Sequence, residues 1–217
     1  TDVGDTQVPD DAEAVVLNVT GLNAPAAGHV TVWPCGAPRP NASNLNLITT
    51  EARPNLVITK VGDDGKVCLY THQGADLIAD LSGWYPAGSP DTPVVPERFL
   101  DTRFGSQIGY AGLKPGKGQT VEIDVTLTGA TQIPDDALAV VLNVTGVSAT
   151  LAGHVTVYPC GSQQPNASNL NLAQGGTRPN LVIMGVGVGG KVCLYTHEGA
   201  DLIVDVMGWY PAPPGSG

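Results

Sequence analysis

Short runs of alternating apolar and polar residues follow one another along the whole chain, separated by Gly, Pro, Asn and Asp. Alternation with a period of two is typical of β-strands that turn one face toward a core, and the separating residues are those that favour turns. In the first half of the chain the pattern predicts strands over residues 15–20, 28–33, 43–48, 55–61, 66–72 and 75–85. The sequence therefore predicts an all-β protein.

The pattern occurs twice. Val15–Thr20 (VVLNVT) aligns with Val140–Thr145, an offset of 125 residues, and the alignment runs without a gap to the end of the chain. Most aligned positions are identical, so both copies are expected to adopt one fold. Asp64-Gly65 between two predicted strands, and Gly189-Gly190 in the second copy, indicate hairpin turns because these residues tolerate positive φ. We predict two tandem antiparallel β-sandwich or Greek-key modules.

The two copies differ in what precedes them. The second copy follows Phe99–Arg103 (FLDTR) and the alternating run 119–125, whereas Thr1 aligns with Thr126, so the first copy has no such lead-in among these residues. We expect a first module over residues 1–87, a Pro- and Gly-rich linker over 88–96, and a second module with lead-in strands over 97–217. The place of the lead-in in the first module is predicted to be vacant, or filled by shared residues of 88–125 or by another chain.

The four cysteines recur in the same positions of both copies. Pairing Cys35 with Cys68 and Cys160 with Cys193 gives the copies equal environments, whereas the two crossed pairings would require them to interlock. A zinc site is the competing reading, but the CxxC spacing is missing and nearby histidines stand alone, so no metal is expected. Two disulfides predict a secreted protein in an oxidising, extracellular setting.

Composition narrows the choice of partners. The net charge is −10, which disfavours nucleic acid because its phosphates would be repelled. The chain contains no apolar run of about 18 residues that could span a bilayer, and no membrane insertion is expected. No cofactor motif is present, and none is predicted.

Several motifs carry a resemblance to a known group of proteins. They are Phe99–Arg103, the two VVLNVT runs, 155–161 (VTVYPCG), 168–172 (SNLNL) and 201–206 (DLIVDV). Together they resemble a repeat module of secreted and cell-surface proteins of actinobacteria and related bacteria, where it occurs in tandem or appended to hydrolases. The resemblance covers nearly the whole chain, and it implies an extracellular module without assigning an established activity to particular residues.

Strand alternation places amides, imidazoles and aromatic rings together on one face of each module. Such groups suit sugars, because rings stack on pyranose faces and amides pair with hydroxyls. The plainer alternative is the solvated face of an antiparallel sheet. The candidate ligand-binding residues are Trp33, Asn44, Asn46, Tyr70 and His72, with Tyr158, Asn169, Asn171, Tyr195 and His197 in the second copy.

Paired carboxylates invite comparison with glycoside hydrolases. Asp76 and Asp80 recur as Asp201 and Asp205, but four residues of extended strand separate their Cα atoms by roughly 13 Å, too far for a typical catalytic pair. We interpret Asp80 as a structural residue that faces Arg53 or a backbone turn, and Asp101 to Arg103 as a buried structural ion pair. No catalytic residues are predicted.

Three function classes follow from these observations. The first is a non-catalytic binding or adhesion module for cell-wall or environmental polysaccharide. The alternative is a structural subunit of an extracellular filament or surface layer that assembles with neighbouring copies of itself by strand complementation. The third and least favoured is a glycoside hydrolase.

Overall fold

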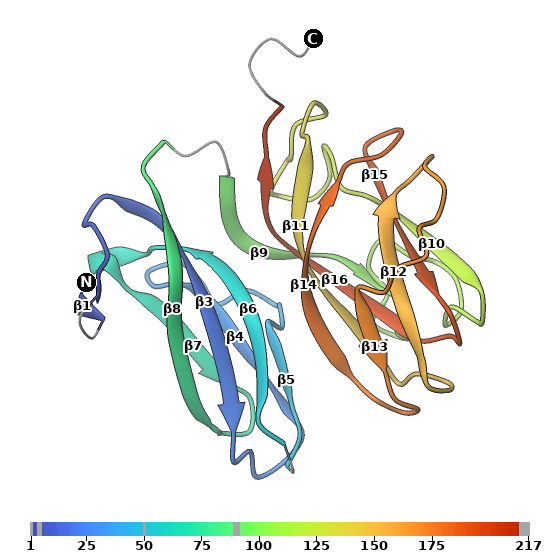
Figure 1. The fold of residues 1–217 in the computed structure, drawn as a ribbon, viewed down its shortest axis with the longest axis horizontal. Helices are drawn as coiled ribbons and strands as arrows, with labels where there is room; N and C mark the ends of the chain where they lie inside the picture. The colour runs from blue at the N-terminus through green and yellow to red at the C-terminus, as the bar shows by residue number, and fades with distance from the viewer. Residues whose placement is uncertain (1, 4–5, 50, 89–91, 213–217) are drawn as a thin grey trace. The chain divides into compact units, whose positions relative to one another are not determined.

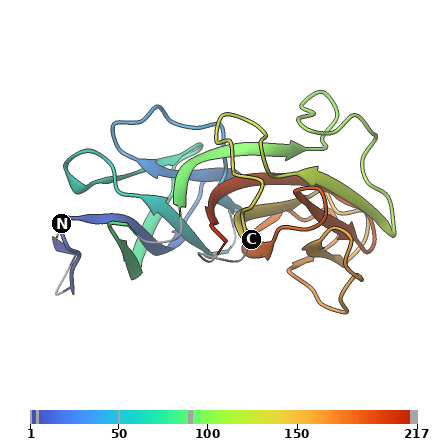
Figure 2. The same ribbon diagram turned by 90° about the horizontal axis from the view of Figure 1, so that it is seen from above.

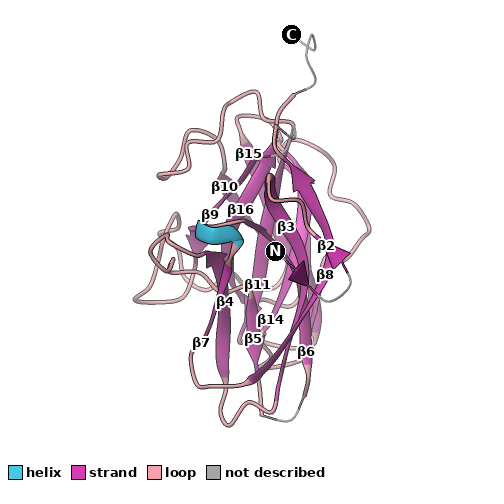
Figure 3. Cartoon of the chain, turned by 90° about the vertical axis from the view of Figure 1, so that its left-hand side faces the viewer, coloured by secondary structure: helices cyan, strands magenta, loops and turns pink. Residues whose placement is uncertain are grey.

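The computed structural model of the chain describes residues 2–3, 6–49, 51–88 and 92–212 (Figure 1). The chain divides into two compact units, Thr1–Pro96 and Glu97–Gly217. The fold consists of strands and loops, and the one helical segment of the described residues is the turn η1 (Asp63–Gly65), drawn in cyan in Figure 3. No helix of the described residues is long and apolar enough to cross a membrane. The all-β prediction is confirmed.

The second unit is a sandwich of two antiparallel four-stranded sheets. One has the order β14-β11-β16-β9 and the other β10-β15-β12-β13. The bounds of these strands are β9 (Thr92–Asp101), β10 (Gln119–Asp124), β11 (Ala139–Val147), β12 (Gly153–Pro159), β13 (Leu170–Leu172), β14 (Arg178–Gly185), β15 (Lys191–Thr196) and β16 (Asp201–Tyr210). Burial alternates along β10, whereas consecutive residues of β11 and β16 are buried.

The first unit is a sandwich of two three-stranded sheets, with the orders β6-β3-β8 and β5-β4-β7. The bounds are β3 (Ala12–Leu22), β4 (Gly28–Pro34), β5 (Leu45–Leu47), β6 (Arg53–Lys60), β7 (Val67–Thr71) and β8 (Asp76–Pro86). A separate short hairpin joins β1 (Asp2–Val3) to β2 (Thr6–Gln7). Strands β3 to β8 correspond one by one to β11 to β16.

The repeat extends to fine detail. The pairing of β3 with β8 shifts register between Val16 and Leu17, and that of β11 with β16 shifts between Val141 and Leu142, which are the equivalent positions. Asp64 and Gly65 have φ values of 55° and 68°, as the turn prediction requires. The predicted disulfides Cys35–Cys68 and Cys160–Cys193 are both present, so each unit carries one.

One strand begins inside the segment that the sequence analysis assigned to a linker. β9 begins at Thr92, inside the segment assigned as a linker from its composition, and it contains the boundary between the two units (green in Figures 1 and 2). Residues 89–91 of that segment lie outside the described residues. β9 is the edge strand of its sheet, a position at which Pro93 and Pro96 are tolerated because one side of the strand needs no backbone donors.

Candidate functional site

The lead-in segment, residues 97–125, accounts for the architectural difference between the two sandwiches. In the second unit β9 pairs with β16 in one sheet, and β10 pairs with β15 in the other. The counterparts of β16 and β15 in the first unit are β8 and β7, and both are edge strands. The first sandwich therefore has two adjacent open edges where the second has two paired strands.

β10 closes one side of the second sandwich with aliphatic side chains. Val121, Ile123 and Val125 point inward and are buried, while Glu122 and Asp124 between them are exposed. The register sets Val121 opposite Leu194 and Ile123 opposite Val192 on β15. This alternation in the sequence correctly indicated a half-buried strand.

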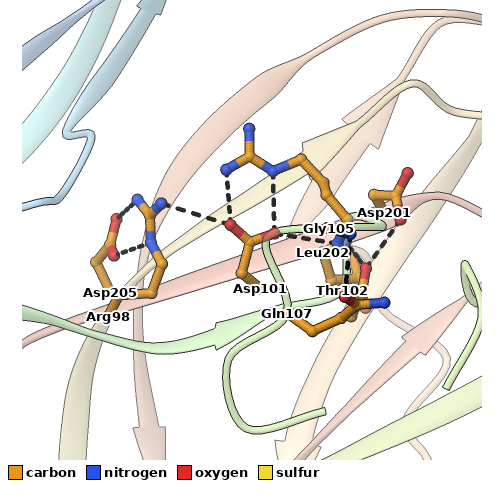
Figure 4. Close-up of polar contacts among 9 residues, drawn as sticks. Arg98, Asp101, Thr102, Gly105, Gln107, Asp201, Leu202 and Asp205 are labelled. Carbon is orange, nitrogen blue, oxygen red and sulfur yellow. Dashed lines mark hydrogen bonds and ion pairs between the residues drawn. The ribbon is translucent and has the colours of Figure 1, made fainter. Parts of the chain in front are cut away.

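β9 closes the other side through an ion pair with β16. Arg98 donates from Nε and Nη2 to the two carboxylate oxygens of Asp205, at 2.8 and 3.0 Å (Figure 4). Asp205 is fully buried, and Arg98 Nη1 also lies 3.6 Å from Asp101. A buried carboxylate requires such a partner, because an unpaired charge in the core is strongly destabilising.

The residues that follow on β9 add a second anchor. The backbone N–H of Thr102 donates to Leu202 O at 3.0 Å, and the Leu202 N–H donates to Thr102 Oγ1 at 2.9 Å. The Thr102 hydroxyl in turn donates to Asp201 at 3.1 Å. Arg98 and Thr102 therefore fix the register of β9 on β16 at two points (Figure 4).

Asp101 and Arg103 form the structural ion pair predicted from the sequence. Arg103 donates from Nη2 to Asp101 at 2.6 Å, and Asp101 is buried. This hydrogen bond from Arg103 to Asp101 raises the pKa of Arg103 above its ordinary value although burial acts in the opposite direction. The predicted ion pair is present at the end of β9, but only Asp101 is buried, since the Arg103 side chain is 41% exposed.

The first unit has a hydrophobic groove where the lead-in would lie. Residues that are fully buried in the second unit have partly exposed counterparts here: Leu142 corresponds to Leu17, and Leu194 to Leu69. The open side contains a cavity of about 270 Å³. We call it the apolar groove, and it is lined by Val8, Val15, Leu17, Val61, Gly65, Lys66, Val67, Ala79 and Leu81.

The carboxylate that anchors the lead-in has an exposed counterpart on β8, on the face opposite the groove, because it lies between Ala79 and Leu81, which line the groove. Asp80, which corresponds to Asp205, is exposed and has no hydrogen bond or ion pair with any residue that the structure describes. The prediction that Asp80 faces Arg53 is therefore wrong. Arg53 Nη2 lies 3.2 Å from a carboxylate oxygen of Glu51 instead. In the second unit the equivalent aspartate is paired with Arg98, which belongs to the lead-in.

The predicted sugar-binding face of the first unit gathers only part of its residues around a cavity. Tyr70 and His72 line a hollow of about 220 Å³ together with His29, Arg39 and Asn41, among others. The rings of His29 and His72 stack with centroids 5.0 Å apart, and the Arg39 guanidinium lies 3.8 Å from the centre of the Tyr70 ring. The residue choice from sequence omitted His29, Arg39 and Asn41, although His29 shares the strand alternation.

The asparagines predicted to bind ligand instead make hydrogen bonds within the fold. Asn44 is buried and its Oδ1 accepts a hydrogen bond from the Val32 N–H at 2.7 Å, as Asn169 does from Val157 at 2.8 Å. Asn46 and Asn171 accept hydrogen bonds from the serines three residues before them, Ser43 and Ser168. These amides hold the loops before β5 and β13 against their sheets.

The remaining aromatic candidates are spread over the same faces. Trp33 is half-buried and donates from Nε1 to Ala37 O at 3.0 Å, and Tyr158 is only 9% exposed. In the second unit Tyr195 and His197 lie around His154, whose ring stacks on His197 at 4.7 Å. Neither Trp33 nor Tyr158 is among the residues that line the hollow around Tyr70 and His72.

The four aspartates have separate environments. Asp76 accepts a hydrogen bond from Asn23 and Asp201 accepts one from Thr102, while Asp80 is exposed and Asp205 is held by Arg98. Across the described residues, no three His, Cys, Asp or Glu side chains gather in a way that could hold a metal ion.

No family model, curated protein or solved structure matches the chain. The function is therefore argued from the geometry of the two units.

Proposed function

We propose that this chain is a non-catalytic, extracellular assembly and adhesion subunit whose first unit takes up an extended segment of a neighbouring polypeptide. The observation that supports the proposal most strongly is the apolar groove, which stands between the two open edges that the lead-in closes in the second unit. Addition of a strand to an exposed edge is an established mode of peptide recognition.

The energetics favour an occupied groove. The exposed edges of β7 and β8 leave backbone donors and acceptors unpaired by protein, and such edges are prone to pair with another chain. Burial of three aliphatic side chains, as β10 does in the second unit, stabilises a complex by on the order of 5 kcal/mol before the cost of ordering the segment. A complementary strand is therefore expected to bind.

The count of lead-in segments indicates where that strand comes from. Residues 1–217 contain two repeats and one lead-in, and that lead-in is part of the second unit. A copy of the chain that lent residues 97–125 to a neighbour would open the same groove in its own second unit, with no net gain. The occupant we propose is accordingly a lead-in-like segment from outside residues 1–217, with alternating aliphatic residues.

Other features agree with an extracellular role. Both units carry a disulfide, and disulfides persist in oxidising compartments. The resemblance to secreted repeat modules points the same way. The two aspartates of β8, which the sequence analysis rejected as a catalytic pair because of their spacing, have the separate environments described above, which favours a non-catalytic role.

The proposal is tested by filling the groove and by offering the segment separately. A copy of residues 94–125 is joined directly before Thr1, which reproduces the Val125–Thr126 junction of the second unit. This extended chain should show slower amide exchange in β7 and β8 and a higher melting temperature. A labelled 94–125 peptide should bind the original chain and fail to bind the extended one.

A matched control carries the same extension with its copies of Val121, Ile123 and Val125 replaced by serine, and it should behave like the original chain. Unchanged exchange in the extended chain would show that the groove accepts no strand. Stabilisation by the extension without any binding of the separate peptide would show that the groove is filled from within one polypeptide, and the assembly proposal would be withdrawn.

Polysaccharide binding is the second candidate function, favoured by the cavity around Tyr70. Its stacked histidines, its arginine and Asn41 offer ring faces and hydrogen-bond donors to a hydroxylated ligand. Retention on an insoluble polysaccharide that Tyr70→Ala abolishes, while the extended chain retains it, would separate this function from strand uptake.

A further inference from the structure

We propose that the open edge of β8 in the first unit selects its partner through Asp80, which binds an arginine of the incoming strand, and through the backbone of Leu77, which binds a threonine four residues later in that strand. This inference rests on the proposed function and specifies the chemistry of the partner. The ligand is an extended peptide with the pattern Arg-x-x-x-Thr that runs antiparallel to β8.

The second unit supplies the geometry. There the arginine is Arg98 of β9 and the threonine is Thr102, directly after β9, and they contact Asp205 and Leu202 on β16. Asp205 and Leu202 correspond to Asp80 and Leu77 at the repeat offset. The surrounding sequence is nearly the same in β8 and β16, so the two receptor positions have the same spacing.

Backbone geometry shows that the threonine position is open. Leu202 directs both its N–H and its C=O toward Thr102, directly after β9. In an antiparallel strand the N–H and C=O of one residue point to the same side, so those of Leu77 point to the open edge of β8. Asp76, the counterpart of Asp201, stands beside it to accept a hydrogen bond from the threonine hydroxyl.

Charge favours the arginine. Asp80 is an exposed carboxylate with no described partner, whereas its counterpart holds a bidentate arginine. Bidentate pairing of a guanidinium with a carboxylate is stronger and more directional than an ammonium contact. On the other side of the groove Lys66 corresponds to Lys191, which lies 3.2 Å from Glu122 of β10. The incoming β10-like strand is therefore expected to carry acidic residues on its outer face.

Two fixed points set the register of the incoming strand. A slip of one residue would separate the arginine from Asp80 and the threonine from the backbone of Leu77. An aliphatic strand without the arginine would fill the groove but would leave the Asp80 carboxylate without a cation. The pair therefore distinguishes lead-in segments from other hydrophobic strands.

The test measures binding of lead-in peptides to the full chain. The 94–125 peptide is compared with versions in which Arg98 is replaced by alanine or lysine, and each is titrated against the original chain and Asp80→Asn. We expect the Arg98→Ala peptide to bind the original chain at least about tenfold more weakly, with the lysine peptide in between. Asp80→Asn should bind all three peptides alike. Asp11→Asn, which removes an exposed carboxylate elsewhere on the first unit, is the charge control.

The outcomes separate the two proposals. Equal binding of the arginine and alanine peptides to the original chain would overturn the arginine inference and leave strand uptake standing. Failure of every peptide to bind would overturn the proposed function. An equal loss of affinity in Asp11→Asn and Asp80→Asn would reduce the effect to net charge and would also overturn the inference. Because Asp80 is exposed and has no described partner, Asp80→Asn is expected to fold as the original chain does.

Discussion

β7 and β15 lie in stretches of identical sequence, from Lys66 to His72 and from Lys191 to His197, and they differ in burial. Leu69 is half-buried, whereas Leu194 has no exposed surface. The difference comes from β10, which pairs with β15 and has no counterpart on β7. Burial of a strand is thus set by its neighbours, and a repeat can contain the same residues while only one copy has a closed core.

The largest expected difference in stability between the two units concerns the buried ion pair. Asp205→Ala should lower the free energy of unfolding of the second unit by about 3 to 5 kcal/mol, because Arg98 would remain buried without its partner. Asp80→Ala in the first unit should change stability little, since Asp80 is exposed. Amide exchange in the two units under increasing denaturant measures both effects. Equal losses would mean that the two aspartates have equivalent surroundings.

The apolar groove predicts a smaller difference in stability between substitutions of equivalent core leucines. Leu142→Ala should destabilise the second unit by about 2 to 5 kcal/mol, because the substitution leaves a cavity in a closed interior. Leu17→Ala removes a half-buried side chain that borders the apolar groove, so its cost should be about half as large. Urea denaturation of both variants provides the comparison. A larger loss for Leu17→Ala would show that the groove is closed in solution.

Much of the fold could be predicted from the sequence because its signals are local or repeated. Alternation identified the strands, and repeat symmetry chose the disulfide pairing over two alternatives. β9 was taken for a linker in its first half because Pro93 and Pro96 are rare inside sheets; only its position at a sheet edge makes them acceptable. The predicted strand over 43–48 shortens to Leu45–Leu47, since Asn44 uses its side chain to hold the preceding loop.

Less of the candidate site could be predicted from the sequence. Alternation alone cannot tell an exposed amide from one that bonds to backbone, and so Asn44 and Asn169 were chosen as ligand groups. The pairing of Arg98 with Asp205 joins residues 107 positions apart, and it depends on which strand lies beside β16. A signal was nevertheless present: Asp205 lies in an otherwise apolar run, where a carboxylate needs a cation.

The smallest expected effect concerns pH and the start of the lead-in. Burial of Glu97 acts to raise the pKa of its carboxyl, but hydrogen bonds from the Thr131 hydroxyl and from the backbone N–H groups of Ala130 and Thr131 outweigh it and lower the pKa below 4.5. The ionised carboxylate therefore stabilises the second unit fully above pH 4.5, and this contribution is lost as the pH falls through the folded-state pKa.

Glu97→Gln should reveal that contribution. The variant is expected to be less stable than the original chain by on the order of 1 kcal/mol near neutral pH, a small loss because the carboxylate is partly exposed to solvent. The difference between the two proteins should stay constant from pH 7 to pH 5 and shrink below pH 4.5. Amide exchange near Thr131 reports the second unit, while exchange in β3 reports the first, which has no such carboxylate among its described residues. A difference that grows as the pH falls would contradict the lowered pKa, since protonation would then strengthen the contact that anchors the lead-in.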